Sequence, residues 1–395
     1  MSGQVAEATR VSASRWAILG AYALLAACTQ LLWLSFAAVD TQTAAVLHVD
    51  VGMVGDLAAI FPFVYIVLAL PTGRWLDLSF SRALGVGALL TGGGALVRLV
   101  TPNSFGWQLA GQLVIAAGQP LVLNSITKVA ARYFPARERA AAISVGTAAL
   151  FIGILAAVLS AGPLFAAGGI GLLLGVQAVP AVIATVLVLI AFRTPPSFPD
   201  DPSATVSLRW LAGDRFMWTL AGLVFIGMGT YNAVATWLQP LLAHFGEGAV
   251  AGNLIAVMTF AGVLGAAVLP SPVAVRDRRR AMLVAALVIS AVAFTAMALS
   301  QNPIWLGIWL FGEGFLLLAS LPVVLDWSEI HAGPERQGAS VGFLMMAGNL
   351  GGLVLVLVEQ AIITNAYVAL ALLAAVSLAG IPVALRLPRV TTSAR

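Results

Sequence analysis

The chain has 395 residues, of which 61% are hydrophobic and only 9% are charged, and its formal net charge is +4. About a quarter of the residues in a soluble globular protein are charged, so this composition excludes an ordinary soluble domain and indicates a membrane protein. The basic residues are scattered over short segments, which argues against binding of nucleic acid. With Cys28 as the single cysteine and no histidine in a long apolar run, we expect no disulfide, metal site or cofactor.

Long apolar runs follow one another along the whole chain. A membrane-spanning helix needs about 20 mostly apolar residues. Turn residues such as Thr101-Pro102-Asn103 separate the runs. The pattern predicts an all-α membrane protein with twelve transmembrane helices, at 16–39, 51–70, 82–101, 105–131, 140–165, 167–192, 216–243, 250–271, 280–300, 303–327, 337–362 and 365–386.

The distribution of basic residues predicts the orientation of these spans. If the N-terminus is cytoplasmic, 19 of the 20 basic residues fall on the cytoplasmic side, and Arg98 is the exception. We therefore expect both termini in the cytoplasm. Since Arg98 lies near the outer end of its span, we expect its side chain to extend to the outer interface, with binding of an anionic solute as the alternative. Asp56 and Glu359 also lie near outer ends of their spans, and we expect them to reach water. The Ala- and Arg-rich, Lys-poor composition favours a bacterial inner membrane.

The chain has a polar stretch in its middle and an internal repeat. Residues 193–215 are rich in proline and polar residues and predict a cytoplasmic linker between two six-helix halves, 1–192 and 216–395. The halves echo each other at 135–146 and 334–342, where a proline and charged residues precede a run of small residues. Transporters built from such repeats bind their solute between the halves, near the middle of the membrane.

Residues 73–82 carry a recognisable motif. The segment from Gly73 through Asp77 to Arg82 resembles the G-x-x-x-D-(R/K)-x-G-(R/K) signature of the major facilitator superfamily, although Leu78 stands where a basic residue is usual. The resemblance implies two pseudo-symmetric six-helix halves and transport by alternating access. An acidic group at a helix end can latch one conformation. The gating candidates are Asp77, Arg82, Asp277, Arg139, Asp326 and Arg336. For the arginines next to Asp277, simple topology-setting charge is the alternative.

A closer resemblance covers several segments. Residues 30–33, 111–134 and 229–239 are similar to stretches of the feline leukaemia virus subgroup C receptor-related family, whose members are linked to transport of choline, ethanolamine and haem. The resemblance implies that spans 1, 4, 7 and 10 line the cavity. It also places Trp33 and Gln119 at ammonium-contacting positions, and Tyr231 or Asn232 at an aromatic one. Asn349 stands where the relatives have what looks like a glutamine.

The residue types near mid-membrane fit a cationic solute. Trp33 and Tyr231 offer ring faces for cation–π contact with an ammonium group, and Gln30 shares the helix face of Trp33; packing is the alternative role for Trp33. Gln119 precedes Pro120, so its amide either binds solute or satisfies the backbone that the proline frees. Glu313 is the deepest carboxyl group. It could attract a cationic solute, carry a coupling proton or pair with a cation from another helix. The alternative is a neutral, hydrogen-bonded acid that fixes helix packing.

These observations favour a secondary carrier or facilitator for a small amine such as choline or ethanolamine. The first alternative is a proton-coupled exporter of drugs or metabolites that uses Glu313. Haem transport is disfavoured because no histidine lies within a span to bind iron. A non-transporting membrane receptor is a further alternative, and the short loops argue against it. We expect no enzyme, since no catalytic cluster is evident, and we expect a monomer in the lipid bilayer with a small-molecule substrate.

Overall fold

The computed structural model describes residues 2–198, 208–247, 250–300 and 302–389. Within these ranges the regular structure is helical, with no β-strand. Contacts between residues divide the chain into two compact units, Met1–Val206 and Ser207–Arg395. The expected linker, 193–215, includes nine positions outside the described ranges, 199–207. The expected halves, 1–192 and 216–395, stay a prediction.

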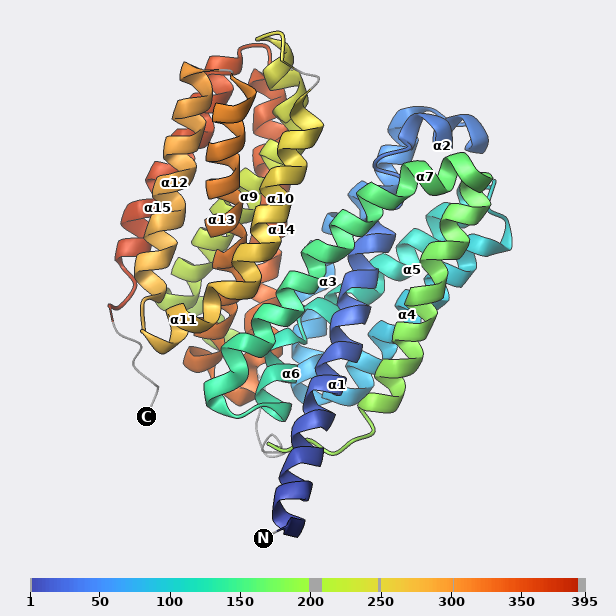
Figure 1. Cartoon of the computed structure of the whole chain (residues 1–395), viewed down its shortest axis with the longest axis vertical. Helices are drawn as coiled ribbons and strands as arrows, with labels where there is room; N and C mark the ends of the chain where they lie inside the picture. Colours follow the sequence, from blue (N-terminus) through green and yellow to red (C-terminus); the bar gives the residue numbers. More distant parts are fainter. Residues whose placement is uncertain (1, 199–207, 248–249, 301, 390–395) are drawn as a thin grey trace. The chain divides into compact units, whose positions relative to one another are not determined.

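The first unit consists of long helices joined by short turns (Figure 1). Its most extensive packing joins α1 to α7 and α4 to α5, and α3 also packs on α5. The elements are α1 (Ser2–Trp33), α2 (Asp40–Leu47), α3 (Val51–Leu78), α4 (Phe80–Val100), α5 (Phe105–Leu123), α6 (Ile126–Tyr133) and α7 (Ala136–Ala191).

The first predicted span, 16–39, is too long at its C-terminal end. Helix α1 ends at Trp33, and the chain turns before α2 begins at Asp40. The intervening residues are apolar for a different reason, because Phe36 and Val39 pack in a buried cluster with residues of α3 and α7. An apolar stretch indicates burial in a membrane or in a protein core, but its composition does not distinguish a helix from a buried turn.

The predicted span 105–131 is a broken helix. Helices α5 and α6 meet at an angle of 41° around Asn124 and Ser125. Pro120 has no N–H group to donate to the carbonyl oxygen of Ala116, one turn earlier in α5. At the break itself, Ser125 Oγ and Tyr22 Oη both donate to the carbonyl oxygen of Val122, at 2.7 and 3.1 Å.

Helix α7 contains a reversal within its 56 residues. Gly168 and Gly169 leave the helical conformation, and Gly169 has a φ of 64°, which favours glycine because it lacks a Cβ. Figure 1 shows α7 reversing its direction, with two legs that run apart from each other. The legs coincide with the predicted runs 140–165 and 167–192. The glycine pair forms the turn between them.

The second unit is likewise helical. Helix α9 packs along α14, α10 packs along α13, and α12 lies against both α13 and α15. Gly314 allows a close approach of α13 to α10, because a Cβ at this position would collide with the backbone of Met258. The elements are α8 (Arg209–Gly213), α9 (Arg215–Ala243), α10 (Ala251–Val268), α11 (Pro270–Val275), α12 (Arg279–Leu299), α13 (Pro303–Ala332), the 3₁₀ helix η2 (Pro334–Arg336), α14 (Gln337–Ile362) and α15 (Ala366–Leu385).

Length and composition identify the helices that can cross a membrane. In the described ranges, 10 helices qualify, or up to 11 if the bent pair α5–α6 counts as one span. Large apolar side chains such as Phe63, Leu159 and Ile304 are 66–77% exposed, which is unfavourable in water and favourable in lipid. The chain is therefore a multi-pass membrane protein. The expected number of twelve spans is not reached when α7 counts as a single helix.

Candidate functional site

Trp33 is the last residue of α1, and its ring has a defined orientation. The indole Nε1 donates a hydrogen bond of 2.9 Å to the carbonyl oxygen of Ala58 in α3. That carbonyl is available because Pro62, one turn later in α3, has no N–H group to bond to it. The ring also contacts Phe61, with centroids 6.2 Å apart. Trp33 is only partly buried, so its position is set by α3 while part of the ring stays accessible.

The two glutamines expected at the site are both buried, each 4% exposed. Gln30 Nε2 lies 3.4 Å from Thr29 Oγ1, on its own helix. Gln119 makes no hydrogen bond to any described residue, so its amide does not satisfy the backbone freed by Pro120, which was one of its two expected roles. The bond from Tyr22 to Val122 holds α1 against α5 one turn from Gln119. The amide of Gln119 thus remains available to a solute.

Arg98 does not extend to the outer interface, and that expectation is wrong. Its side chain is 1% exposed and donates to Ser35 Oγ at 3.0 Å, to the Leu32 carbonyl at 3.3 Å and to Gln108 Oε1 at 3.1 Å. The guanidinium also lies 4.9 Å from the ring centroid of Phe36. No described carboxylate pairs with it. The C-terminal end of α1, where the helix dipole is negative, holds the charge instead.

Sequence reasoning missed this network because its acceptors are neutral. Leu32 presents a free carbonyl only because α1 ends one residue later, and nothing in the local sequence marks that end. Ser35 Oγ also donates to Gln177 Oε1 at 2.6 Å, which connects α1 to the second leg of α7. Arg98 thereby fixes the end of α1 that carries Trp33. The one signal in the sequence was that Arg98 is the only basic residue that does not fall on the predicted cytoplasmic side.

In the second unit, the expected site residues lie on α9 and α14. Tyr231 Oη is 3.2 Å from Thr259 Oγ1 in α10, and the side chain is partly buried. Asn232 is packed closely against Gly352 of α14, where a Cβ would meet its amide nitrogen. Asn349 Nδ2 donates to the Met345 carbonyl one turn earlier, at 2.9 Å. Of these amides, that of Asn349 is engaged with its own backbone.

Glu313 lies in the middle of α13 with 0% of its surface exposed. Neither of its carboxyl oxygens has a hydrogen-bond partner. Its neighbour is Ser290 of α12, so the carboxyl group faces the helix that packs behind α13. Glu359 of α14, which the sequence placed near water at the outer end of its span, is also 0% exposed with both oxygens unpartnered. That expectation is wrong, because the packing of α14 covers the side chain.

The gating candidates of the first unit behave differently from one another. Asp77, at the end of α3, forms an ion pair of 2.9 Å with Lys128 of α6, and both side chains are fully buried. Arg82 is exposed and makes no ion pair or hydrogen bond with a described residue. Arg139 donates to the carbonyls of Ala131 and Phe134, at 3.2 and 3.3 Å, and so ties the start of α7 to the end of α6.

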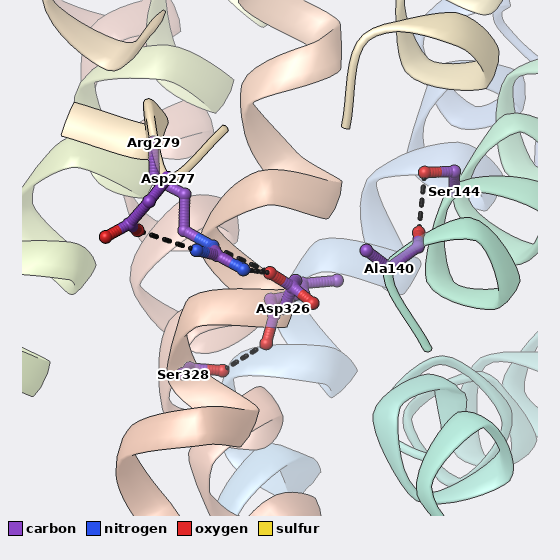
Figure 2. A network of polar contacts seen from close by, with 7 residues as sticks. Ala140, Ser144, Asp277, Arg279, Asp326 and Ser328 are labelled. Atoms are coloured by element: carbon purple, nitrogen blue, oxygen red, sulfur yellow. Dashed lines mark hydrogen bonds and ion pairs between the residues drawn. The ribbon is translucent and has the colours of Figure 1, made fainter. Parts of the chain in front are cut away.

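In the second unit, Asp277 and Asp326 are brought together by Arg279. Figure 2 shows the Arg279 guanidinium between the two carboxylates, 3.0 Å from Asp277 and 2.6 Å from Asp326. Arg336 is exposed, and its guanidinium lies 5.2 Å from the ring centroid of Trp210. The sequence placed Arg279 in a cluster of four similar arginines. Only the packing of α12 against α13 selects it as the partner of Asp326.

The ion clusters of the two units differ in burial and in composition. The pair of Asp77 and Lys128 is fully buried, with one acid and one base. In the second unit Arg279 lies between two carboxylates, and that of Asp277 is 31% exposed.

Comparison with known proteins agrees with this architecture. The family described as Major Facilitator Superfamily matches residues 18–356. Solute carrier family 49 member A3 of Xenopus tropicalis is 26% identical over 88% of this chain and 77% of its own length. The choline/ethanolamine transporter FLVCR2 of Homo sapiens is 24% identical over 90% of this chain and 73% of its own length. These relatives come from animals and give no support to a bacterial inner membrane.

Solved structures share the fold at low sequence identity. The human organic anion transporter MFSD10 (TETRAN) aligns with a TM-score of 0.78 at 14% identity, covering 94% of this chain and 99% of its own. A bacterial homologue of the iron transporter ferroportin in an outward-facing state also gives 0.78 at 14% identity, covering 94% and 98%. Identities this low indicate the arrangement of helices alone.

Proposed function

The chain belongs to the major facilitator superfamily, and on that premise we propose that it carries a small organic cation, an amine of the choline or ethanolamine kind, across a membrane by alternating access. Membership makes it a transporter of a small molecule rather than an enzyme. The amine is our inference, supported by similarity to a transporter named for choline and ethanolamine. It is supported further by the aromatic residue at the end of α1.

The observation that carries the proposal is the fixed but accessible ring of Trp33. Its N–H group is occupied by the Ala58 carbonyl, so the polar edge of the indole is used inside the protein. The part of the side chain left for a solute is the π face, which attracts cations. A ring whose orientation is already set loses little entropy on binding. Trp33 is thus suited to cation–π contact with a quaternary or primary ammonium group.

Tyr231 and Gln119 complete the proposed site. Tyr231 is held through its hydroxyl to Thr259, which also leaves its ring face for a cation. Gln119 contributes an amide that is buried and without a described partner, suited to the hydroxyl of a choline-like solute.

We further propose twelve spans with both termini in the cytoplasm. A straight helix of 56 residues would be about 84 Å long, more than twice the thickness of the hydrocarbon core, so α7 crosses twice with its turn at Gly168–Gly169. Two crossings by α7 and one by the α5–α6 pair raise the count of qualifying helices to twelve. This arrangement also keeps the basic residues on one side.

Uptake into proteoliposomes tests the function. An inside-negative potential of 100 mV favours a monovalent cation by about 2.3 kcal/mol, or about 50-fold accumulation. We expect saturable uptake of labelled choline or ethanolamine driven by that potential. Cation–π contact with a desolvated ring contributes about 2 kcal/mol, so Trp33→Leu is expected to weaken apparent affinity about 30-fold, and Trp33→Phe to weaken it less.

Trp218→Leu is the matched control, because Trp218 is 56% exposed and its indole also donates to a backbone carbonyl. It should transport like the parent. If Trp33→Leu and Trp218→Leu take up the amine with the same apparent affinity, Trp33 does not contact the solute. No uptake of any amine by the folded parent protein, under either a potential or a pH gradient, would refute the amine as substrate.

A further inference from the structure

A groove between α1 and the two legs of α7 has a buried amide in its wall. Its volume is about 330 Å³, and its lining is mostly apolar, including the exposed side chains of Leu159 and Val176. Gln177 also lines the groove, although it is only 1% exposed, and its Nε2 makes no hydrogen bond to any described residue. Buried donors are ordinarily paired, so this amide indicates a place for a ligand that supplies an acceptor.

A chain of hydrogen bonds connects this amide to a buried cation. Arg98 Nη1 donates to Ser35 Oγ at 3.0 Å, and Ser35 Oγ donates to Gln177 Oε1 at 2.6 Å. The same hydroxyl lies farther from the carbonyl oxygens of Leu31 and Leu32, at 3.4 and 2.9 Å. Each hydrogen bond in such a chain polarises the next one. The charge of Arg98 therefore makes the N–H group of Gln177 a stronger donor than an isolated amide.

The charge of Arg98 also favours an acceptor that is itself negative. No carboxylate pairs with Arg98 in the part of the chain that the structure describes, and its Nη2 is buried without a hydrogen bond. Two nearby helices of the first unit do carry acids, but Asp77 pairs with Lys128 and Glu138 pairs with Arg15. A buried cation without a counter-ion is costly. A ligand with a negative group, such as a phosphate, would lower that cost.

The depth of these groups in the bilayer narrows the choice of ligand. Arg98 lies sixteen residues from Arg82, and Gln177 lies sixteen residues from Arg193. Arg82 and Arg193 are exposed and suited to one membrane interface. At 1.5 Å per residue, Arg98 and Gln177 are about 24 Å from that interface, whereas the hydrocarbon core is about 30 Å thick. They thus lie near the opposite boundary of the hydrocarbon, within reach of the ester and phosphate oxygens of a lipid.

We propose that the groove binds an anionic phospholipid. One acyl chain lies against the apolar wall, and a phosphate or ester oxygen accepts a hydrogen bond from Gln177 Nε2, with Arg98 supplying the positive charge behind it. Apolar surface that faces a bilayer is covered by lipid in any case, and the amide is the feature that selects one kind of lipid. No residue of the groove belongs to the proposed amine site, so the inference goes beyond the proposed function.

Photocrosslinking in nanodiscs locates the site in the whole protein. The probe is phosphatidylglycerol with a diazirine near the head-group end of one acyl chain, diluted in phosphatidylcholine. Mass spectrometry of peptides should find adducts within 156–160 and 176–180, and excess unlabelled phosphatidylglycerol should suppress them. Excess inorganic phosphate should not, because it has no acyl chain to occupy the groove. Adducts spread evenly over the exposed helices, or suppressed by inorganic phosphate, would overturn the proposal.

Native mass spectrometry in detergent measures the selectivity. We expect the parent protein to bind phosphatidylglycerol about tenfold more tightly than diacylglycerol with the same chains, as for one hydrogen bond to a charged acceptor, and more tightly than phosphatidylcholine. Gln177→Leu should lose this preference. Gln177→Glu should lose it and stay folded, because its carboxylate still accepts from Ser35 and lies near Arg98 but repels a phosphate.

Ser160→Ala is the matched control. Ser160 lines the same groove, but its hydroxyl already donates to the Ala156 carbonyl, so this variant should bind phosphatidylglycerol like the parent. The proposal fails if folded Gln177→Leu and Gln177→Glu keep the preference of the parent. It also fails if the parent binds phosphatidylglycerol no more tightly than either of the other two lipids. Neither measurement depends on whether the protein transports an amine.

Discussion

Removal of the Arg98 guanidinium should destabilise the first unit, and its contacts allow an estimate of the effect. Arg98→Met keeps the length and volume of the side chain but deletes the bonds to Ser35, Leu32 and Gln108. Hydrogen bonds from a charged donor contribute about 1.5–3 kcal/mol each. The loss is partly offset, because burial of an isolated charge itself costs several kcal/mol that the substitution recovers.

The expected net effect of Arg98→Met is a loss of about 2–4 kcal/mol in the free energy of unfolding. For a unit of this size, 1 kcal/mol lowers the midpoint of thermal unfolding by about 2–4 °C, so the shift is about 4–16 °C. Arg98→Lys keeps the charge but not the branched set of donors. We expect it to fall between Arg98→Met and the parent protein.

Cys28 supplies the assay for this prediction. It is the single cysteine of the sequence and is 2% exposed, so a thiol-reactive dye fluoresces only when the first unit unfolds. Arg82→Met is the matched control, since Arg82 is exposed and has no described partner. If Arg98→Met and Arg82→Met unfold at the same temperature in detergent, the network does not stabilise the end of α1 and the reasoning fails.

Two further substitutions test the packing in each unit. Asp77→Asn removes the carboxylate that forms the ion pair with the buried Lys128 and should cost about 3–5 kcal/mol. Combining it with Lys128→Gln should recover at least half of the lost thermal stability, and a double variant no better than the single one would contradict this. Gly314→Ala places a methyl group against the backbone of Met258 and should cost about 1–3 kcal/mol, whereas Gly312→Ala meets only ordinary contact and should be neutral. Equal unfolding temperatures for the two alanine variants would contradict the close approach of α10 and α13.

The sequence by itself determined the class of protein and the course of the chain. Long apolar runs and basic residues on alternate breaks are consequences of the bilayer, which acts on every span independently of the others. For that reason the runs coincide with the helices, and the motif from Gly73 to Arg82 was enough to identify the superfamily. The exceptions, the end of α1 at Trp33 and the break at Asn124, occur where buried apolar residues continue after the helix stops.

The partners of the polar residues were decided only by the tertiary structure. Arg98 looked like an interfacial residue and Glu359 like a water-accessible one, because distance from a span end measures depth in the membrane but not which neighbouring helix covers a side chain. The same limit hid the pairing of Asp77 with Lys128 and the position of Glu313 against α12. A side chain in lipid must satisfy its polar atoms inside the protein, and residues far apart in sequence supply those partners only after the helices have packed.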